Sequence, residues 1–123
     1  MGSGFLRRSA VRRFREQGWT RAAILPPATC LEVRRTFLAE VKPWTGPLLR
    51  QLTSRAEPHA LSVDGYVTNP VANPHRTGFP AFSTVETTVM RACPLVEVVE
   101  TLLDGPAAML QSAYYESSRG TLT

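Results

Sequence analysis

The sequence predicts an α+β fold in a single domain. Segments 28–41 and 93–106 carry apolar residues at the three- and four-residue spacing of amphipathic helices. Segment 108–116 is typical of a strand that runs into a glycine turn. With 123 residues, of which 43% are hydrophobic, the chain is long enough for one modest core. We therefore expect residues 1–123 to form one unit of helices beside a few strands.

The first part of the chain predicts a helix, a strand and a second helix. In 5–17, Leu6, Ala10 and Phe14 recur every four residues and would pack inward, and Gly18 suits a helix end. The apolar run 19–25 stops at two prolines and is interpreted as a strand. The helix at 28–41 starts after a proline, which favours helix beginnings. The side chains expected on its inner side are Leu31, Phe37, Leu38 and Val41.

The middle of the chain predicts a short helix and a long loop. Segment 46–55 carries Leu48, Leu49 and Leu52, which fit one face of a helix. Segment 56–80 is rich in proline, glycine, asparagine and aspartate, so regular structure is not expected for most of it. Loops of this length in compact domains are usually functional or disordered.

The last part predicts two helices followed by the strand. Segment 81–92 is interpreted as a helix despite its threonines. Segment 93–106 has Pro94 at the first helical position and Gly105 as its stop. Its apolar stripe consists of Leu95, Val98, Val99 and Leu102. The strand at 108–116 would be about nine residues long.

The positive charge is concentrated at the N-terminus. Residues 1–17 contain five arginines and one glutamate, which accounts for the whole net charge of +4. This helix would contact nucleic acid or an anionic membrane, or it would be a solvated face, which is the preferred interpretation. The arginines stand where a secretory signal needs apolar residues, and no apolar run reaches the length of a membrane span. Cys30 and Cys93 lack metal-site spacing and are interpreted as reduced, partly buried thiols of a cytoplasmic protein.

Motifs for common chemistries are missing from the sequence. It contains no GxGxxG, no GK[ST] phosphate loop and no GxSxG elbow. The histidines, His59 and His75, do not stand at metal-ligand spacing, and a solvent-facing loop position is the simpler interpretation of both. No catalytic or metal-ligating residue is therefore predicted within the chain.

Three stretches together resemble the N-terminal half of the phytanoyl-CoA dioxygenase family, whose members are iron(II)- and 2-oxoglutarate-dependent oxygenases. They are "FREQGWTRAAILPPATCLEVRRTFLAEV" at 14–41, "VETLLDGP" at 99–106 and "MLQSAYYESSRGT" at 109–121. The third is similar to the family strand that immediately precedes its metal motif, histidine, any residue, aspartate. The first two stretches are generic when taken alone.

The resemblance implies N-terminal helices and the first strands of an incomplete double-stranded β-helix, or jelly roll. The chain would then be the N-terminal fragment of a larger oxygenase domain that hydroxylates a small molecule. Such enzymes hold Fe(II) with two histidines and one carboxylate, which leaves positions open for 2-oxoglutarate and O2. By this resemblance the triad and the 2-oxoglutarate-binding arginine would lie beyond Thr123. We therefore expect the chain alone to be inactive and to bind neither cofactor tightly.

The same resemblance assigns four candidate site residues. Gln111 matches a glutamine that some family members use to hydrogen-bond 2-oxoglutarate, and its amide can donate to a carboxylate. Tyr115, four residues on, would point to the same side of the strand, although those relatives carry asparagine there. His75 and Tyr66 would lie near the substrate entrance. Alternatively, Gln111 satisfies neighbouring backbone, Tyr115 packs, and segment 59–79 is a proline-stiffened surface loop.

Two other functions stay open. The chain could be a small binding protein that uses its arginine helix on nucleic acid or acidic lipid, with nucleic acid the less favoured partner. It could also be a shortened interaction partner whose open strand edge pairs with another chain, including a second copy of itself.

Overall fold

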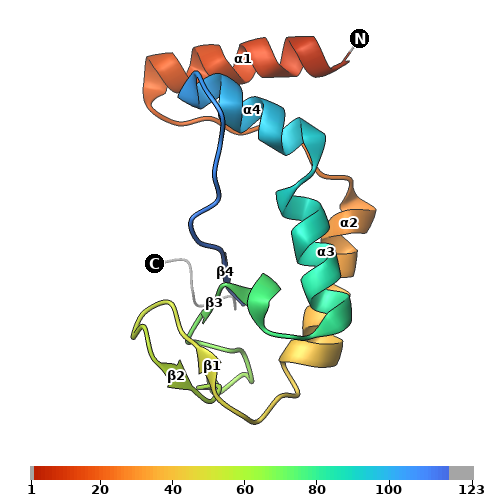
Figure 1. Cartoon of the computed structure of the whole chain (residues 1–123), viewed down its shortest axis with the longest axis vertical. Coiled ribbons are helices and arrows are strands. Elements are labelled where there is room, and N and C mark those ends of the chain that lie inside the picture. Colours follow the sequence, from red (N-terminus) through yellow and green to blue (C-terminus); the bar gives the residue numbers. More distant parts are fainter. Residues whose placement is uncertain (1, 117–123) are drawn as a thin grey trace.

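The computed structural model describes residues 2–116, except the side chains of residues 2, 3 and 5–7, and it is an α+β structure as predicted. Helices α1 (Gly2–Gln17) and α4 (Cys93–Leu103) pack together at one end (Figure 1). Short strands occupy the other end. Helices α2 (Pro27–Thr36) and α3 (Pro80–Met90) join the two ends along one side. Segment 104–112 returns along the opposite side to the strands.

Helix α1 confirms the predicted N-terminal helix. Gly18 ends it with a φ of 78°, and its amide donates to the Phe14 carbonyl at 2.8 Å. Ala10 is buried, as the four-residue spacing predicted. Phe14 is 40% exposed, so its inward placement was wrong, because α1 packs mainly on α4 and lies far from the aromatic core. The Leu6 side chain lies outside the described residues.

The second predicted helix is also confirmed. Helix α2 continues directly into η1 (Phe37–Val41), a π-helical turn in which the Lys42 amide donates to the Phe37 carbonyl at 2.9 Å. Phe37 and Val41 are buried in the core. Leu31 and Leu38 are exposed, so only half of the expected apolar stripe faces inward.

Helices α3 and α4 lie where the sequence predicted them. Both begin at a proline in the first turn, where the missing amide hydrogen costs nothing. The predicted stripe of α4 is half-buried. The left-handed residue that ends α4 is Asp104, with a φ of 55°, and the prediction of Gly105 for this role was wrong by one position.

Two predicted elements are replaced by other structure. Segment 19–25 has no regular secondary structure and pairs with no strand in the described chain, so the predicted strand was wrong; two prolines follow it, and α2 begins at the second of them. Segment 46–55 is not a helix: β1 (Leu48–Leu49) turns back through Ser54, at a φ of 54°, into β2 (Ala56–Glu57). Leu48 is buried while Leu49 and Leu52 are exposed, so these leucines do not form the expected single face.

The strands form two antiparallel pairs that one isolated bridge connects. Strand β1 pairs with β2, and a bridge between Arg50 and Val71 connects β1 to β3 (Val71–Ala72). Strand β3 pairs with β4 (Ala113–Tyr114), with Val71 opposite Tyr114. The predicted strand at 108–116 is therefore confirmed only near its C-terminal end. Segment 56–80 is mostly irregular as expected, but it contributes β2, β3 and the 3-10 turn η2 (Pro74–Arg76).

The core lies where η1, α3 and the strands meet. Its buried residues are Phe37, Val41, Leu48, Val67, Val71 and Phe82. The Phe37 ring stacks on the Tyr114 ring with centroids 4.0 Å apart, and Phe82 packs edge-on against both. These aromatic contacts hold β4 against η1 and α3.

Candidate functional site

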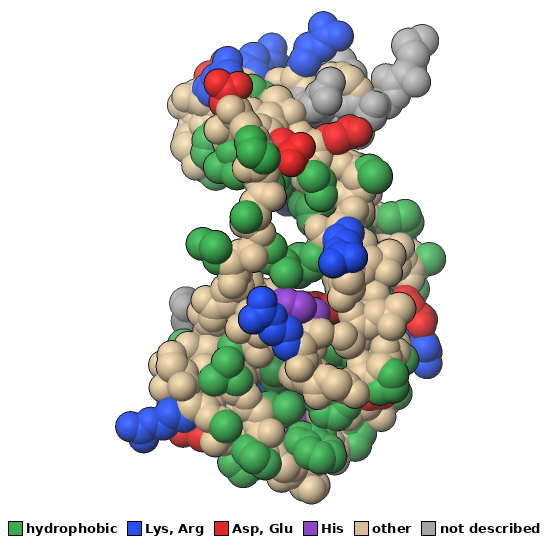
Figure 2. Space-filling model, viewed as in Figure 1, with side chains coloured by type: hydrophobic (Ala, Val, Ile, Leu, Met, Phe, Trp, Pro, Cys, Tyr) green, Lys and Arg blue, Asp and Glu red, His purple; other side chains and the backbone are tan. Residues whose placement is uncertain are grey.

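A cavity of about 570 Å³ lies between α3, α4, η2 and the segment that descends from α4. Figure 2 shows it as a hollow beside the descending segment, with basic side chains at its rim. This volume is within the range of small-molecule sites, about 300–1,000 Å³. Its polar lining residues are His75, Arg76, Thr87 and Arg91. Its apolar lining residues are Met90, Val96, Ala107 and Met109.

His75 is held in this cavity at two points. Its ring Nδ1 is 2.9 Å from the Ser112 Oγ, and its carbonyl accepts a hydrogen bond from the Ser83 Oγ at 2.6 Å. Ser112 is buried, and the backbone amide of Asn73 donates a hydrogen bond to the Ser112 backbone carbonyl at 2.7 Å. His75 is therefore a positioned side chain, and the alternative of a solvent-facing loop histidine was wrong. His75 and Ser112 lie close together because β3 pairs with β4, and the sequence alone did not predict this pairing.

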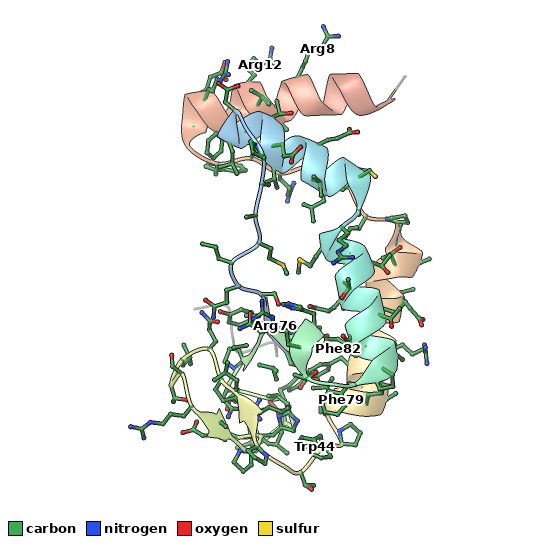
Figure 3. The ribbon with its side chains drawn as sticks, in the orientation of Figure 1. Arg8, Arg12, Trp44, Arg76, Phe79 and Phe82 are labelled. Atoms are coloured by element: carbon green, nitrogen blue, oxygen red, sulfur yellow. The ribbon has the colours of Figure 1, made fainter. Side chains whose placement is uncertain are left out.

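The charge in the cavity is positive. Among residues 2–116, neither Arg76 nor Arg91 has a carboxylate within 4.0 Å. Figure 3 shows Arg76 at the end of the hollow nearest the strands. Glu86, one turn before Met90 on α3, is 5% exposed, and its Oε2 has no hydrogen-bond partner in the described chain. Burial raises the pKa of this carboxyl and so favours its neutral form.

A second hollow of about 360 Å³ contains two other predicted site residues, Tyr66 and Tyr115. Its remaining lining residues are Arg34, Leu38, Tyr114 and Glu116. Glu116 accepts from Lys42 Nζ at 2.7 Å and from the Val67 amide at 2.7 Å. Burial raises the pKa of the Tyr114 hydroxyl, and the neighbouring Glu116 adds to this effect.

Gln111 lines neither hollow. Its amide Nε2 donates to the Gln51 Oε1 at 2.6 Å, at the exposed surface. Gln111 and Tyr115 are both exposed, whereas Ser112 and Tyr114 between them pack inward. The two predicted cofactor residues therefore share the outer face of the strand segment. The structure does not bring them together with His75, and it separates His75 from Tyr66.

Sequence reasoning missed a buried network around Arg50, whose side chain is only 1% exposed. Its Nε donates to the Glu57 carbonyl at 3.0 Å, its Nη1 donates to the Asn69 carbonyl at 3.2 Å, and its Nη2 is 3.0 Å from the His59 Nδ1. A guanidinium has only donors, so His59 accepts through Nδ1 and donates from Nε2 to the Val41 carbonyl at 2.9 Å.

His59 is thus a half-buried structural residue, and its predicted solvent-facing position was wrong. Burial lowers the pKa of Arg50, with the Glu57 carboxylate acting in the opposite direction. No sequence motif marks Arg50, because its partners are Glu57 in β2, His59 just after β2, and Asn69, which lies 19 positions away.

Residues 2–116 contain no group of three histidine, cysteine, aspartate or glutamate side chains that could hold a metal ion. Cys30 and Cys93 are exposed, which corrects the expectation of partly buried thiols. Within the same residues, no helix combines the length and apolar character that crossing a membrane requires. Comparisons with protein-family models, with curated proteins and with solved structures found no match to this chain.

Proposed function

We propose that this chain forms the N-terminal portion of a phytanoyl-CoA dioxygenase-like hydroxylase, an Fe(II)- and 2-oxoglutarate-dependent enzyme that acts on a small molecule. The observation that supports this most is β4, which lies within the third family-like stretch. It pairs with β3 on one edge, and in the described chain no strand covers its other edge. In the proposed enzyme, the jelly roll continues from this open edge.

The outer face of the same segment supports the proposal. Leu110 is 91% exposed, and Tyr115 on the same segment is also an exposed large side chain. Exposed apolar surface can mark a contact with further protein or with a ligand. Additional strands of a jelly roll would cover this face and enclose Gln111. A second copy of the chain that pairs at the β4 edge would cover it as well, and sedimentation would then detect a dimer.

The described residues fit only part of the cofactor requirement. They supply no ligand set for Fe(II), so iron in the proposed enzyme would be held by residues outside 2–116. Gln111 carries an amide that can donate to 2-oxoglutarate, but in this structure that amide donates to Gln51. Binding 2-oxoglutarate at this position would require Gln111 to exchange its Gln51 partner for the cofactor carboxylate.

The coding sequence downstream of codon 123 tests the proposal. Read in all frames, it should encode histidine, any residue, aspartate, followed later by a histidine and an arginine. A polypeptide that includes these residues should form succinate from 2-oxoglutarate when Fe(II) is present, whereas the 123-residue chain should not. A downstream sequence without these ligands would overturn the proposal, and so would succinate formation by the 123-residue chain alone.

A second candidate function is supported by the arginines of α1. Arg8, Arg12 and Arg15 are exposed and line a groove of about 480 Å³ against α4. Figure 3 shows Arg8 and Arg12 projecting from the outer side of α1. Such a helix could bind phosphate groups of nucleic acid or of an acidic lipid surface.

Binding to a DNA duplex and to anionic vesicles at two salt concentrations tests this second function. Each phosphate contact on DNA should contribute a slope of about −0.9 in log K against log salt. Replacing Arg8, Arg12 and Arg15 with alanine should abolish binding, whereas replacing the exposed arginines Arg21, Arg34 and Arg55 should not. No binding to either surface at low salt would eliminate this candidate.

A further inference from the structure

We propose that the cavity between η2, α3, α4 and the segment 107–109 binds a small molecule with one anionic head group and an apolar body. The inference does not depend on the proposed oxygenase, because it uses only residues described here and requires no iron.

The arginines indicate the head group. Arg76 comes from η2 and Arg91 from the end of α3, so two separate elements bring like charges to one hollow. No described carboxylate within 4.0 Å neutralises either guanidinium. Both arginines are exposed, so their guanidinium groups are accessible to a bound anion. Guanidinium groups bind carboxylate and phosphate oxygens through paired, charge-assisted hydrogen bonds.

His75 supplies a third polar group at a fixed place. The Ser83 hydroxyl holds the His75 backbone carbonyl, and the ring cannot turn away without breaking the contact between its Nδ1 and the Ser112 hydroxyl. In the described chain its Nε2 makes no hydrogen bond. When Nδ1 accepts from the Ser112 hydroxyl, Nε2 carries the proton and is available as a donor to the anion.

The rest of the lining indicates the apolar body. Met90, Val96 and Met109 line the same cavity, and methionine side chains adapt to ligands of different shape. Glu86 lies on α3 but is not among the residues that line the cavity. One charged end and one apolar side are the features of an amphiphilic anion.

Binding of three eight-carbon probes tests the proposal. Octanoate, octyl phosphate and 1-octanol would be titrated by isothermal calorimetry into the full chain, the two anions below their micellar concentrations. We expect both anions to bind at least about tenfold more tightly than octanol, since each charge-assisted hydrogen bond contributes about that factor. The tighter of the two anions identifies the head group as carboxylate or phosphate, and either result supports the inference.

Variants then locate the binding. Arg76→Gln and Arg91→Gln should each weaken anion binding about tenfold and leave octanol binding unchanged. Met109→Ala should weaken all three probes. The matched control is Arg55→Gln, an exposed arginine outside the cavity, which should change nothing. Thermal melts should show that the arginine variants stay folded, because neither guanidinium donates a hydrogen bond within residues 2–116.

Three results would overturn the inference. The first is that neither anion binds. The second is that octanol binds as tightly as octanoate, which would mean that the arginines contribute nothing. The third is that Arg55→Gln weakens anion binding as much as Arg76→Gln, which would place the anion elsewhere on a basic surface.

Discussion

Replacing Arg50 with methionine would remove the guanidinium that links the residue after β1 to β2, to His59 just after β2, and to Asn69. Methionine has a similar length and no charge, so the change tests hydrogen bonding with little change in packed volume. Arg50 is 1% exposed and engages the Glu57 carbonyl, the Asn69 carbonyl and the His59 Nδ1. In the variant all three acceptors lose their donor in a place that water reaches poorly.

The magnitude follows from these contacts. A hydrogen bond from a charged group contributes about 1.5–3 kcal/mol, and an acceptor left unsatisfied costs about 1–3 kcal/mol. The loops can relax enough for water to reach some of the three acceptors, and the buried charge is removed together with its desolvation cost. We therefore expect the free energy of unfolding to fall by about 3–5 kcal/mol, a large share of the roughly 5–15 kcal/mol typical of a domain.

Urea denaturation followed by circular dichroism measures this change. With an m-value of about 2 kcal/mol per molar urea, the midpoint should fall by roughly 2 M. Arg55→Met is the matched control, because Arg55 is exposed, and its free energy of unfolding should stay within about 0.5 kcal/mol of that of the unmodified chain. A loss below about 1 kcal/mol in Arg50→Met would refute the reasoning that this guanidinium holds the loops together.

Three further substitutions test the core, a buried acid and a helix end. Phe37→Ala should lower the free energy of unfolding by about 3–5 kcal/mol in urea melts, because the ring is buried, whereas Phe14→Ala should cost under about 1 kcal/mol; equal losses would contradict the assigned core. Burial raises the pKa of Glu86 above its usual 4.5, so the unmodified chain loses stability as the pH rises through and above that value. The stability of Glu86→Gln relative to the unmodified chain should therefore increase from pH 4 to pH 7 in urea melts, and a pH-independent difference would contradict this. Asp104→Gly should raise the free energy of unfolding by up to about 1 kcal/mol in thermal melts, because Asp104 has a φ of 55°, and a loss would show that its side chain stabilises the turn.

The helices were predictable because their signals are local. Proline in the first turn and apolar residues three and four positions apart locate α2, α3 and α4 without knowledge of distant contacts. Segment 46–55 could not be assigned in this way. Leucines at 48, 49 and 52 fit a helix face equally well, and the hairpin is stabilised by bonds from Arg50 to residues as far away as Asn69.

The candidate site was less predictable than the fold. The sequence identified His75 as a residue of a long, irregular loop, but its significance depends on Ser112, which lies 37 positions away. The cavity is lined by four separate segments: α3 contacts η2 and α4 directly, and the antiparallel pairing of β3 with β4 brings in the segment that follows α4. Gln111 and Tyr115 were expected on one face of a strand, and both are exposed on the same side of the segment. Of the two, however, only Tyr115 lines the smaller hollow.

The segment that follows α4 is held by hydrogen bonds at its two ends, at Ala107 and at Ser112. At one end the Ala107 amide donates to the Glu100 carboxylate at 3.2 Å, and at the other the Ser112 carbonyl accepts from the Asn73 amide at 2.7 Å. No hydrogen bond among the described residues holds the amides of residues 108–110 between these anchors. Their amide protons should therefore exchange quickly with solvent deuterium. If a ligand in the cavity covers this segment, exchange at 108–110 should be slower with the ligand than without it.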